Sequence, residues 1–391
     1  MARRAHSFGS AVLCALALAA GNALAQRPAP PAAPPPGAPA APPPGMRGDG
    51  PAPEPKPFNV TRLDPALDAL VAPNAKAEEI ASGFGLNEGP VWVPEGRSGY
   101  LIVGGLLDNV LYKVTPDDVS DKRVSVFMEK AGYSGTDVNH TGAQTRSGRS
   151  HVLLIGPSCA SLDSQGRLIW CADNDRTLNR LEKDGTRTVL SRGSPDGKRF
   201  SGPNDIVVRR DDGVYLTDND FGLRDAGQNP DKQMPNGIWL IRDGQSKLVL
   251  DATTLGGIPN GVALSPDERW LYATSLSKLM RYEVKPDGTL GAGSLFTEGP
   301  GIGDGMKVDV QGNVYSTSGA GPGIVRITAP SGKALGYLNL PIYGGEPKRQ
   351  ICATNVAFGD ADGKGLYVTA CDVVYRIRMK VAGVMPGAPK R

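Results

Sequence analysis

Histidine and cysteine are scarce in this sequence, which has three histidines and five cysteines among 391 residues. Two of the histidines, His140 and His151, fall within or beside one polar, glycine-rich stretch, and we interpret both as loop or rim residues. Soft metal ions favour histidine and cysteine ligands, so the composition does not point to a site for them. The sequence also lacks a G-x-S-x-G elbow, a Cys/His nucleophile pair and a P-loop, which argues against nucleophilic acyl transfer and P-loop chemistry.

Excess charge and long apolar runs are missing as well. One apolar run follows Arg3 and Arg4 and ends in A-L-A before Gln26, which predicts a secretory signal peptide over residues 1–25. No later run is long enough to cross a bilayer. The formal net charge is +3, and +1 without the two leader arginines, so nucleic acid and anionic membranes are not indicated as partners. We expect an exported protein, periplasmic or secreted, whose mature chain does not insert into a membrane.

Two compositional segments follow the leader. Residues 26–57 are dominated by proline and alanine and are expected to form an extended, disordered linker. Residues 58–391 are rich in glycine and show few long amphipathic periods, which predicts an all-β domain.

A short pattern recurs six times in this domain. A polar residue opens an apolar stretch, a turn follows eight or nine positions later, and a second apolar run such as V-Y-L-T comes next. Each copy is typical of a strand, a tight turn and a strand. The polar residues that open the six copies are Glu88, Ser158, Asn204, Asn260, Asp304 and Asn355.

The spacing of the copies indicates the architecture. Their turns lie at Gly96, Gly166, Gly213, Glu268, Gly312 and Gly363. Intervals of roughly 45–70 residues, each with room for four strands, are typical of propeller blades, whereas the repeats of a β-solenoid are shorter and more regular. We therefore predict a six-bladed β-propeller with a metal site in its central channel.

The metal prediction depends on the common register of the opening residues. In a closed ring their side chains converge at one end of the axis. Glu88, Asn204, Asn260 and Asp304 supply only oxygen atoms and a formal charge of −2, a set that favours Ca²⁺, with Mg²⁺, Mn²⁺ or Zn²⁺ as alternatives. Taken singly, each is also explained as a turn or strand-start residue, since Asn-Gly and Asp-Gly are common turn dipeptides.

Two long loops are expected on the same face as this ring. They are the insertion at 131–151 and the loop at 219–233, because connectors that enter a first strand or leave a second strand share that face. We expect the loops to form a substrate rim. The alternative is that they are solvated connectors. The substrate-binding candidates are Ser158, Asp218, Asn219, Asp220 and Asn355.

Four of the cysteines form two pairs, and the two members of each pair are expected to face each other across one hairpin. Cys159 and Cys171 are symmetric about one turn, and Cys352 and Cys371 are nearly symmetric about another. Neighbouring antiparallel strands place such residues opposite each other. Disulfides and buried free thiols both remain open.

Taken together, the motifs resemble the family of senescence marker protein, gluconolactonase and luciferin-regenerating enzyme over roughly residues 78–380. The matching segments are E-G-P-V-W at 88–92, G-R-L-I-W-C at 166–171, G-P-N-D-I-V-V at 202–208, P-N-G-V-A-L-S-P-D at 259–267, D-G-M-K-V-D at 304–309 and N-V-A-F-G-D at 355–360. The resemblance implies that Glu88, Asn260 and Asp304 bind a divalent metal, with Asn204 completing or flanking the site. It also implies that Asp304 acts as the acid/base in lactone hydrolysis.

Several positions depart from the family pattern. Ser158 stands where relatives tend to have Asn, Ser275 where an Asp is usual, and Gly104 and Gly105 where Ser/Thr-Asp is common. Gly202 and Pro203 occupy the positions before Asn204 where some relatives carry a substrate-binding Arg.

The function expected from the sequence is metal-dependent opening of a sugar lactone or a similar cyclic ester. The metal would polarise the carbonyl, and Asp304 would serve as acid/base. A hydrolase of phosphotriesters or other esters is one alternative. A non-catalytic propeller that binds a ligand around a structural metal is the other. The expected partner is a small-molecule substrate.

Overall fold

The computed structural model describes residues 55–138, 141–142, 144–147, 150–224, 229–319, 323–341 and 352–387. The predicted signal peptide and almost all of the predicted linker lie outside these residues, as does His140. Within the described part of the chain, no helix is long and apolar enough to cross a membrane.

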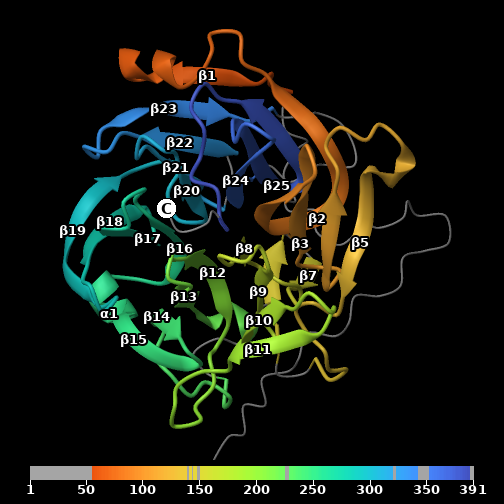
Figure 1. Ribbon diagram of the computed structural model, residues 1–391, viewed down its shortest axis with the longest axis vertical. Coiled ribbons are helices and arrows are strands. Elements are labelled where there is room, and N and C mark those ends of the chain that lie inside the picture. The colour runs from red at the N-terminus through yellow and green to blue at the C-terminus, as the bar shows by residue number, and fades with distance from the viewer. Residues whose placement is uncertain are drawn as a thin grey trace, which may run out of the picture. The chain divides into compact units, whose positions relative to one another are not determined.

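Regular structure in the described residues is almost entirely β, and the sheets are arranged around a common centre (Figure 1). Three of the sheets have four strands each. They contain β8 (Ala160–Leu162), β9 (Leu168–Ala172), β10 (Thr177–Leu181) and β11 (Arg187–Ser191); β12 (Pro203–Val208), β13 (Val214–Asp218), β14 (Gly237–Arg242) and β15 (Gln245–Asp251); and β16 (Pro259–Leu264), β17 (Trp270–Ser275), β18 (Lys278–Val284) and β19 (Leu290–Glu298).

The other sheets are larger or much smaller. A five-stranded sheet contains β20 (Met306–Val308), β21 (Val314–Ser316), β22 (Ile324–Thr328), β23 (Ala334–Asn339) and β1 (Asn59–Arg62). A six-stranded sheet contains β24 (Asn355–Gly359), β25 (Gly365–Arg378), β2 (Ala77–Glu95), β3 (Ser98–Gly105), β4 (Val110–Val114) and β5 (Val124–Glu129). A hairpin of β6 (Gln144–Ser147) and β7 (Ser150–Leu153) lies within the predicted insertion.

Helices are few and short. The four that occur in the described residues are η1 (Pro65–Ala69), η2 (Asp121–Arg123), η3 (Asp220–Gly222) and α1 (Ala252–Leu255). The prediction of an all-β propeller is therefore confirmed.

The prediction of six separate blades is wrong, because the structure has five large sheets. The cause is that β2 and β25 are long strands that each take part in two pairings. The first part of β2 pairs with the end of β25, from Ala77↔Ile377 to Ser82↔Val373, and its second part pairs with β3. The units that begin at Glu88 and Asn355 are thus joined into one six-stranded sheet.

The first strands of the six repeats still surround the centre as a closed series. β2 contacts β8, β8 contacts β12, β12 contacts β16, β16 contacts β20, β20 contacts β24, and β24 contacts β2. The opening polar residues lie at or just before the starts of these strands, and Glu88 lies where the second part of β2 begins to pair with β3, so this series brings residues distant in sequence to one channel.

The predicted hairpin turns are present. Gly312 adopts a left-handed backbone with φ 87°, and Glu268, at the equivalent place in its own hairpin, adopts φ 57°. Positive φ is costly for a residue with a side chain, so the turn geometry is kept at Glu268 despite an unfavourable residue type.

The core is built from strand residues that pack within and between the sheets. Trp92 from β2 stacks on Tyr367 from β25 with ring centroids 5.6 Å apart, and Tyr315 meets Phe358 edge to face at 5.0 Å. All four side chains are buried. Burial of a large apolar side chain contributes about 1.5–3 kcal/mol, so the first contact joins the two units of the six-stranded sheet and the second joins that sheet to the five-stranded one.

Both cysteine sets form disulfides, which settles the alternative left open by the sequence. Cys159 bonds Cys171 with Cα atoms 5.1 Å apart, and Cys352 bonds Cys371 with Cα atoms 5.6 Å apart. Each bond joins the residues just before a first strand to the second strand of the same unit.

Candidate functional site

The polar residues that open the first strands gather at one end of the channel. Asp304 is in hydrogen-bonding contact with both Asn260 and Glu88. Asn355 makes similar contact with Glu88. These four residues come from four separate repeats, so the structure supports the predicted convergence for them.

Asn204 is less closely connected. Its backbone carbonyl accepts a hydrogen bond from the Ser158 hydroxyl at 2.7 Å. Its side chain is half-buried, and no hydrogen bond joins it to Glu88, Asn260 or Asp304. A ligand role for Asn204 therefore stays a prediction.

Irregular pairing occurs at three of the opening residues. The register of β2 against β3 shifts between Glu88 and Val91, that of β12 against β13 shifts between Pro203 and Asp205, and that of β16 against β17 shifts between Pro259 and Val262. Each shift places extra residues on the first strand at the site. β-Bulges of this kind redirect side chains, which is why the strict alternation of a strand does not apply here.

The glycines that follow three of these residues have a packing role. A Cβ at Gly89 would lie 2.5 Å from the Ser158 carbonyl oxygen, and one at Gly261 would lie 2.1 Å from the Asp304 carbonyl oxygen. A Cβ at Gly305 would lie 2.0 Å from Asn355 Cγ. The Glu-Gly, Asn-Gly and Asp-Gly pairs are therefore sites where neighbouring first strands approach closely, and not the turns that such dipeptides commonly mark.

Two charged residues that the sequence prediction missed also belong to the site. Asp205 is buried, and its carboxylate accepts from the backbone N–H groups of Ile206 at 2.9 Å and Val262 at 3.1 Å. Lys307 Nζ lies 3.4 Å from Asn355 Oδ1 and 3.0 Å from the Met306 carbonyl oxygen. Asp205 directly follows Asn204 in the N-D pair, but ordinary alternation would turn it away from Asn204; the bulge is what admits it.

The three carboxyl groups influence one another strongly. Burial raises the pKa of Glu88 well above its ordinary value, and the nearby Asp304 and Asp205 carboxylates raise it further. Burial and the Asp205 charge raise the pKa of Asp304 to about 7. Burial also raises the pKa of Asp205, while the Lys307 ammonium lowers it. The site thus concentrates negative charge that only one nearby ammonium offsets.

Ser158 and Asn355 are more deeply embedded than their predicted substrate role requires. Ser158 is buried and donates from Oγ to Asp173 Oδ1 at 2.8 Å. Asn355 is also buried, and its Oδ1 accepts from the Val356 N–H at 2.9 Å. The structure connects Asn355 directly to the carboxyl cluster, whereas Ser158 joins its own unit to the neighbouring first strand through the Asn204 carbonyl.

The predicted rim residues Asp218 and Asn219 have no exposed surface. The Asp218 carboxylate accepts from the Ser201 N–H at 3.0 Å and the Gly202 N–H at 2.8 Å. Asn219 Nδ2 donates to the Pro259 carbonyl at 3.1 Å. These side chains hold the backbone that leads into Asn204 and Asn260. This placement does not favour direct substrate contact, which stays an untested prediction.

Asp220 is half-buried and forms an ion pair with Lys232. Lys232 also donates to Asn236 Oδ1 at 2.9 Å. Asp220 is therefore the most accessible of the five predicted substrate-binding residues.

The two long loops, which the topology places on one face, contact each other in the structure. Thr141 forms an isolated antiparallel bridge with Leu223, and the Gly142 N–H donates to the Gly222 carbonyl at 3.1 Å. Ser134 from the insertion donates to Asp175 Oδ1 at 3.0 Å. The described parts of the insertion therefore pack against the 219–224 segment. Residues 225–228, with several residues of the insertion, lie outside the described part of the chain.

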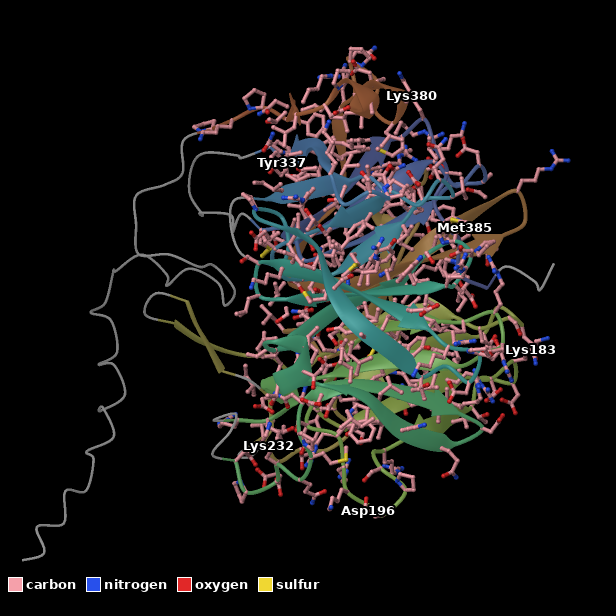
Figure 2. The ribbon with its side chains drawn as sticks, turned by 90° about the vertical axis from the view of Figure 1, so that its left-hand side faces the viewer. Lys183, Asp196, Lys232, Tyr337, Lys380 and Met385 are labelled. Atoms are coloured by element: carbon pink, nitrogen blue, oxygen red, sulfur yellow. A yellow bond between two sulfur atoms is a disulfide. The ribbon has the colours of Figure 1, made fainter. Side chains whose placement is uncertain are left out.

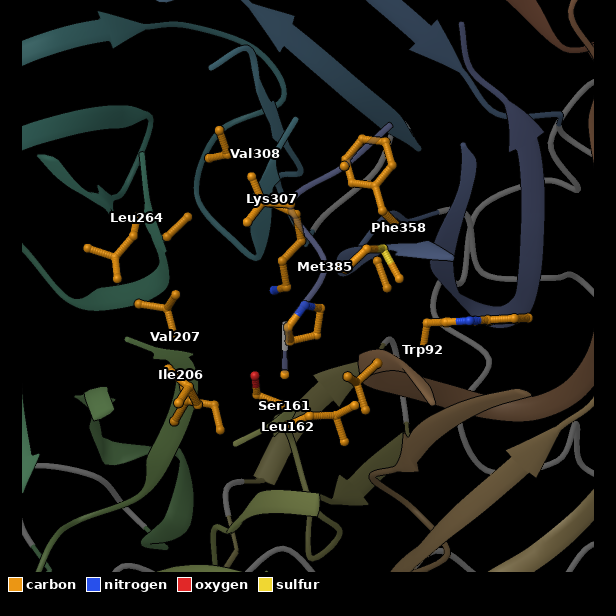
Figure 3. Close-up of a pocket in the computed structure, with 18 of the residues that line it drawn as sticks. Trp92, Ser161, Leu162, Ile206, Val207, Leu264, Lys307, Val308, Phe358 and Met385 are labelled. Atoms are coloured by element: carbon orange, nitrogen blue, oxygen red, sulfur yellow. The ribbon is translucent and has the colours of Figure 1, made fainter. Parts of the chain in front are cut away.

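A cavity of about 620 Å³ lies further along the same first strands (Figure 3). Its walls are mainly apolar and include Val91, Ile206, Leu264 and Phe358, with Lys307 among the lining residues. None of the three carboxyl residues lines it, so this chamber is separate from the polar site.

The C-terminal strap, residues 382–387, lies against this chamber. The Val310 N–H donates to the Ala382 carbonyl at 3.0 Å, and the Val384 N–H donates to the Val308 carbonyl at 2.9 Å. Met385 of the strap and Lys232 of the rim loop lie toward opposite faces of the domain (Figure 2). The strap and the rim therefore belong to different ends of the channel.

The donor set has the chemistry of a hard-cation site. Glu88 and Asp304 supply carboxylate oxygens, and the side-chain amide of Asn260 hydrogen-bonds Asp304 while that of Asn355 hydrogen-bonds Glu88. Among the described residues, no three His, Cys, Asp or Glu side chains are grouped closely enough to form a ligand cluster by themselves. A metal here would depend on this mixed set of carboxylates and amides, which is typical of Ca²⁺.

Ser275, one of the departures from the family pattern, has an unusual environment. The Ser275 hydroxyl is buried without a hydrogen-bond partner among the described atoms. A Cβ at Gly257 would lie 2.5 Å from it. The serine therefore occupies a tight place at the end of β17, next to the strand that carries Asn260.

Comparisons with known proteins agree on one family. Residues 86–372 match the model of the SMP-30/gluconolactonase/LRE-like region. A gluconolactonase of Zymomonas mobilis is 30% identical over 340 residues, which cover 83% of this chain and 87% of that protein. The pentonolactonase XacC of Haloferax volcanii is 34% identical over 290 residues, or 73% of this chain and 81% of that protein.

A solved structure supports the fold. The gluconolactonase XC5397 of Xanthomonas campestris superposes with a TM-score of 0.62 at 23% identity, and the match covers 85% of this chain and 99% of that one.

Proposed function

The chain belongs to the SMP-30/gluconolactonase/LRE-like family, and we propose on this basis that it is a lactonase that opens the cyclic ester of a sugar acid. The observation that supports this most directly is the contact of Asp304 with Glu88 and Asn260 at the end of the channel. The relatives named gluconolactonase and pentonolactonase share most of their length with this chain.

We propose that one divalent cation, with Ca²⁺ favoured, is held by Glu88, Asn260 and Asp304, with Asn204 beside them. When bound, such a cation polarises the lactone carbonyl and lowers the pKa of a coordinated water. Two close carboxyl groups with raised pKa values form a site that a divalent cation would stabilise. Mg²⁺, Mn²⁺ and Zn²⁺ remain alternatives for the same oxygens.

Asp304 is the proposed acid/base. In the metal-free protein its pKa is raised to about 7 by burial and the Asp205 charge, and a bound cation would favour the ionised form that can accept a proton. In the proposed reaction, the attacking water forms a bond to the carbonyl carbon and gives a proton to the Asp304 carboxylate. The bond to the ring oxygen then breaks, and Asp304 returns the proton to that oxygen to give the open hydroxy acid.

The two segments that meet at Thr141 and Leu223 are the proposed substrate rim. They contact each other through backbone hydrogen bonds, which gives the rim a defined form. A sugar lactone carries several hydroxyl groups, and Asp220 offers a half-buried carboxylate for them at this face. Four buried residues would support the site indirectly, by fixing the strands that carry it: Ser158, Asp218, Asn219 and Asn355.

We also propose that the protein works outside the cytoplasm. Two buried disulfides are typical of proteins that mature in an oxidising compartment. The arginine-led apolar leader of the sequence points the same way.

The experiment that tests this function is a panel of sugar lactones assayed on chelated protein, with Ca²⁺, Mg²⁺, Mn²⁺ and Zn²⁺ added back one at a time. Ring opening is followed by acid release. We expect turnover of at least one aldonolactone only with metal present. The panel should include a phosphotriester and a simple aryl ester. Faster turnover of either would replace the lactone proposal, and metal binding with no turnover of any ester would indicate a binding protein.

A further inference from the structure

Lys307 occupies the boundary between the polar site and the apolar chamber. It belongs to β20, three residues after Asp304, and it is half-buried. Figure 3 shows its side chain extending from the strand toward the middle of the lining residues. Arg209 and Arg210 also line the chamber, but they are paired with Asp211 and Glu268, so Lys307 is the cation associated with the carboxyl cluster.

Lys307 interacts with two residues of the site, Asn355 and Asp205. Its ammonium donates to Asn355 Oδ1 at 3.4 Å and acts electrostatically on Asp205. Asn355 is in turn in hydrogen-bonding contact with Asp205 and with Glu88. Lys307 is therefore coupled to the site through two buried neighbours.

Asp205 differs from the other two carboxylates in its surroundings. Its two oxygens accept backbone N–H groups from two adjacent first strands, Ile206 of β12 and Val262 of β16. Such bonds fix the carboxylate in place and favour its charged form. Asp205 thus links β12 to β16 through these two hydrogen bonds. A cation that offsets its charge must leave both bonds in place.

The formal charges give the consequence. Glu88, Asp205 and Asp304 carry −3 when ionised, and Lys307 reduces the total to −2. We propose that Lys307 is a positioning residue and internal counter-ion: it neutralises Asp205, so that the site presents two uncompensated carboxylates matched to one divalent cation. This inference rests on the proposed metal-dependent function.

The proposal predicts a change in preference for ion valence. Replacing Lys307 by Met leaves a net −3, which attracts a trivalent ion more strongly than a divalent one. For one unit charge about 10 Å from the ion, at an effective dielectric constant of about 20, the ratio of Tb³⁺ to Ca²⁺ affinity rises about tenfold.

The test is isothermal titration of the full chain with Ca²⁺ and, separately, with Tb³⁺, at fixed pH and ionic strength. The variants are K307M, K307R as the charge-conserving control, and the double variant D205N/K307M. We expect K307R to keep the wild-type affinity ratio, K307M to raise it about tenfold, and the double variant to restore it. A merely structural lysine would not give this rescue, because the double variant loses more contacts than the single one.

An unchanged ratio in folded K307M would overturn the inference. If K307M does not fold, as judged by near-UV circular dichroism, D205N alone provides the reverse test: its site carries −1, so the ratio must fall about tenfold. A D205N ratio equal to wild type contradicts the counter-ion role. If the wild-type chain binds neither ion, the proposed metal site itself fails, and that outcome is distinct from failure of the Lys307 proposal.

Discussion

The side chains of Glu88 and Asp304 meet in hydrogen-bonding contact, although they come from different sheets and from opposite halves of the domain. Two ionised carboxylates in contact repel each other, and a cation or a shared proton between them relieves that repulsion. Burial and the Asp304 charge raise the pKa of Glu88, whereas burial and the Asp205 charge raise the pKa of Asp304. The arrangement costs stability in the free protein, which is why we assign it to function rather than to folding.

Asp304→Asn should remove most of the metal affinity and nearly all hydrolysis without unfolding the domain. The substitution keeps the shape but removes one charge and the proposed proton acceptor, and loss of a general base commonly lowers turnover about 10²–10⁴-fold. Calorimetric titration with Ca²⁺ and lactone kinetics measure the two effects. Asp287→Asn, at an exposed turn where Asp287 bonds Thr289, is the matched control. Normal turnover by Asp304→Asn would move the acid/base role to another group, with Glu88 next.

The stability of metal-free protein should fall as pH rises from about 4 to about 7 through its buried carboxyls. The folded pKa values of Asp304 and Asp218 are raised to about 7 from an ordinary 3.8. In this pH window the folded state holds protons that the unfolded state has lost. A rise in pH therefore lowers the free energy of unfolding. Thermal melts in chelator at pH 5 and pH 7.5 measure the difference in Tm.

Asp304→Asn should reduce that pH dependence, because it removes one of the responsible groups. Saturating Ca²⁺ should reverse the trend, since metal binding favours the ionised carboxylates and competes with protons. An identical pH dependence in wild type and Asp304→Asn would show that Asp304 does not titrate in this range.

Asp218→Ala and Asp220→Ala should differ sharply despite their closeness in sequence. Asp218 satisfies two buried backbone N–H groups, and leaving such groups unpaired costs about 1–3 kcal/mol each. Asp220 makes a partly exposed ion pair with Lys232, which is worth about 0–1 kcal/mol. Urea unfolding measures both free energies. Equal losses would contradict the positioning role given to Asp218.

Gly319→Ala should weaken metal binding with only a local structural effect. Gly319 has φ 69°, and a Cβ there would lie 2.2 Å from Asp304 Oδ2, so an added methyl displaces the carboxylate. Gly312→Ala is the control, because it has a similar φ of 87° but its nearest neighbour is Pro330 at 3.3 Å. Both variants carry the backbone strain, and only Gly319→Ala should lower Ca²⁺ affinity. Equal Ca²⁺ affinities for the two variants would show that the carboxylate is not displaced.

The sequence was sufficient for the parts of the fold and site that follow from periodicity. The spacing of strand pairs gave the propeller, and the common register of Glu88, Asn260, Asp304 and Asn355 gave their convergence. The cross-hairpin spacing of the cysteines limited their partners, although only the structure decided for disulfides.

What the sequence could not give depends on geometry between strands. The bulge at Asn204 allows Asp205 to belong to the site. A periodic sequence pattern does not indicate where a strand contains an extra residue. The burial of Asp218 and Asn219 follows from bonds to the backbone of neighbouring segments, which polar composition alone does not distinguish from a solvent-facing loop. The separate blades were wrongly expected because nothing in a repeat shows that β2 and β25 run on from one unit into the next.

The pairing of β2 with β25 sets the order in which the molecule can be completed. Its hydrogen bonds join residues near Ala77 to residues near Ile377, so the ring has an unpaired edge until nearly the last strand has left the ribosome. A nascent chain of this design cannot close its ring early, and it therefore leaves exposed strand edges for chaperones to shield. Once formed, this pairing closes the ring, so separation of β2 from β25 would open the ring without breaking the pairings within the other sheets.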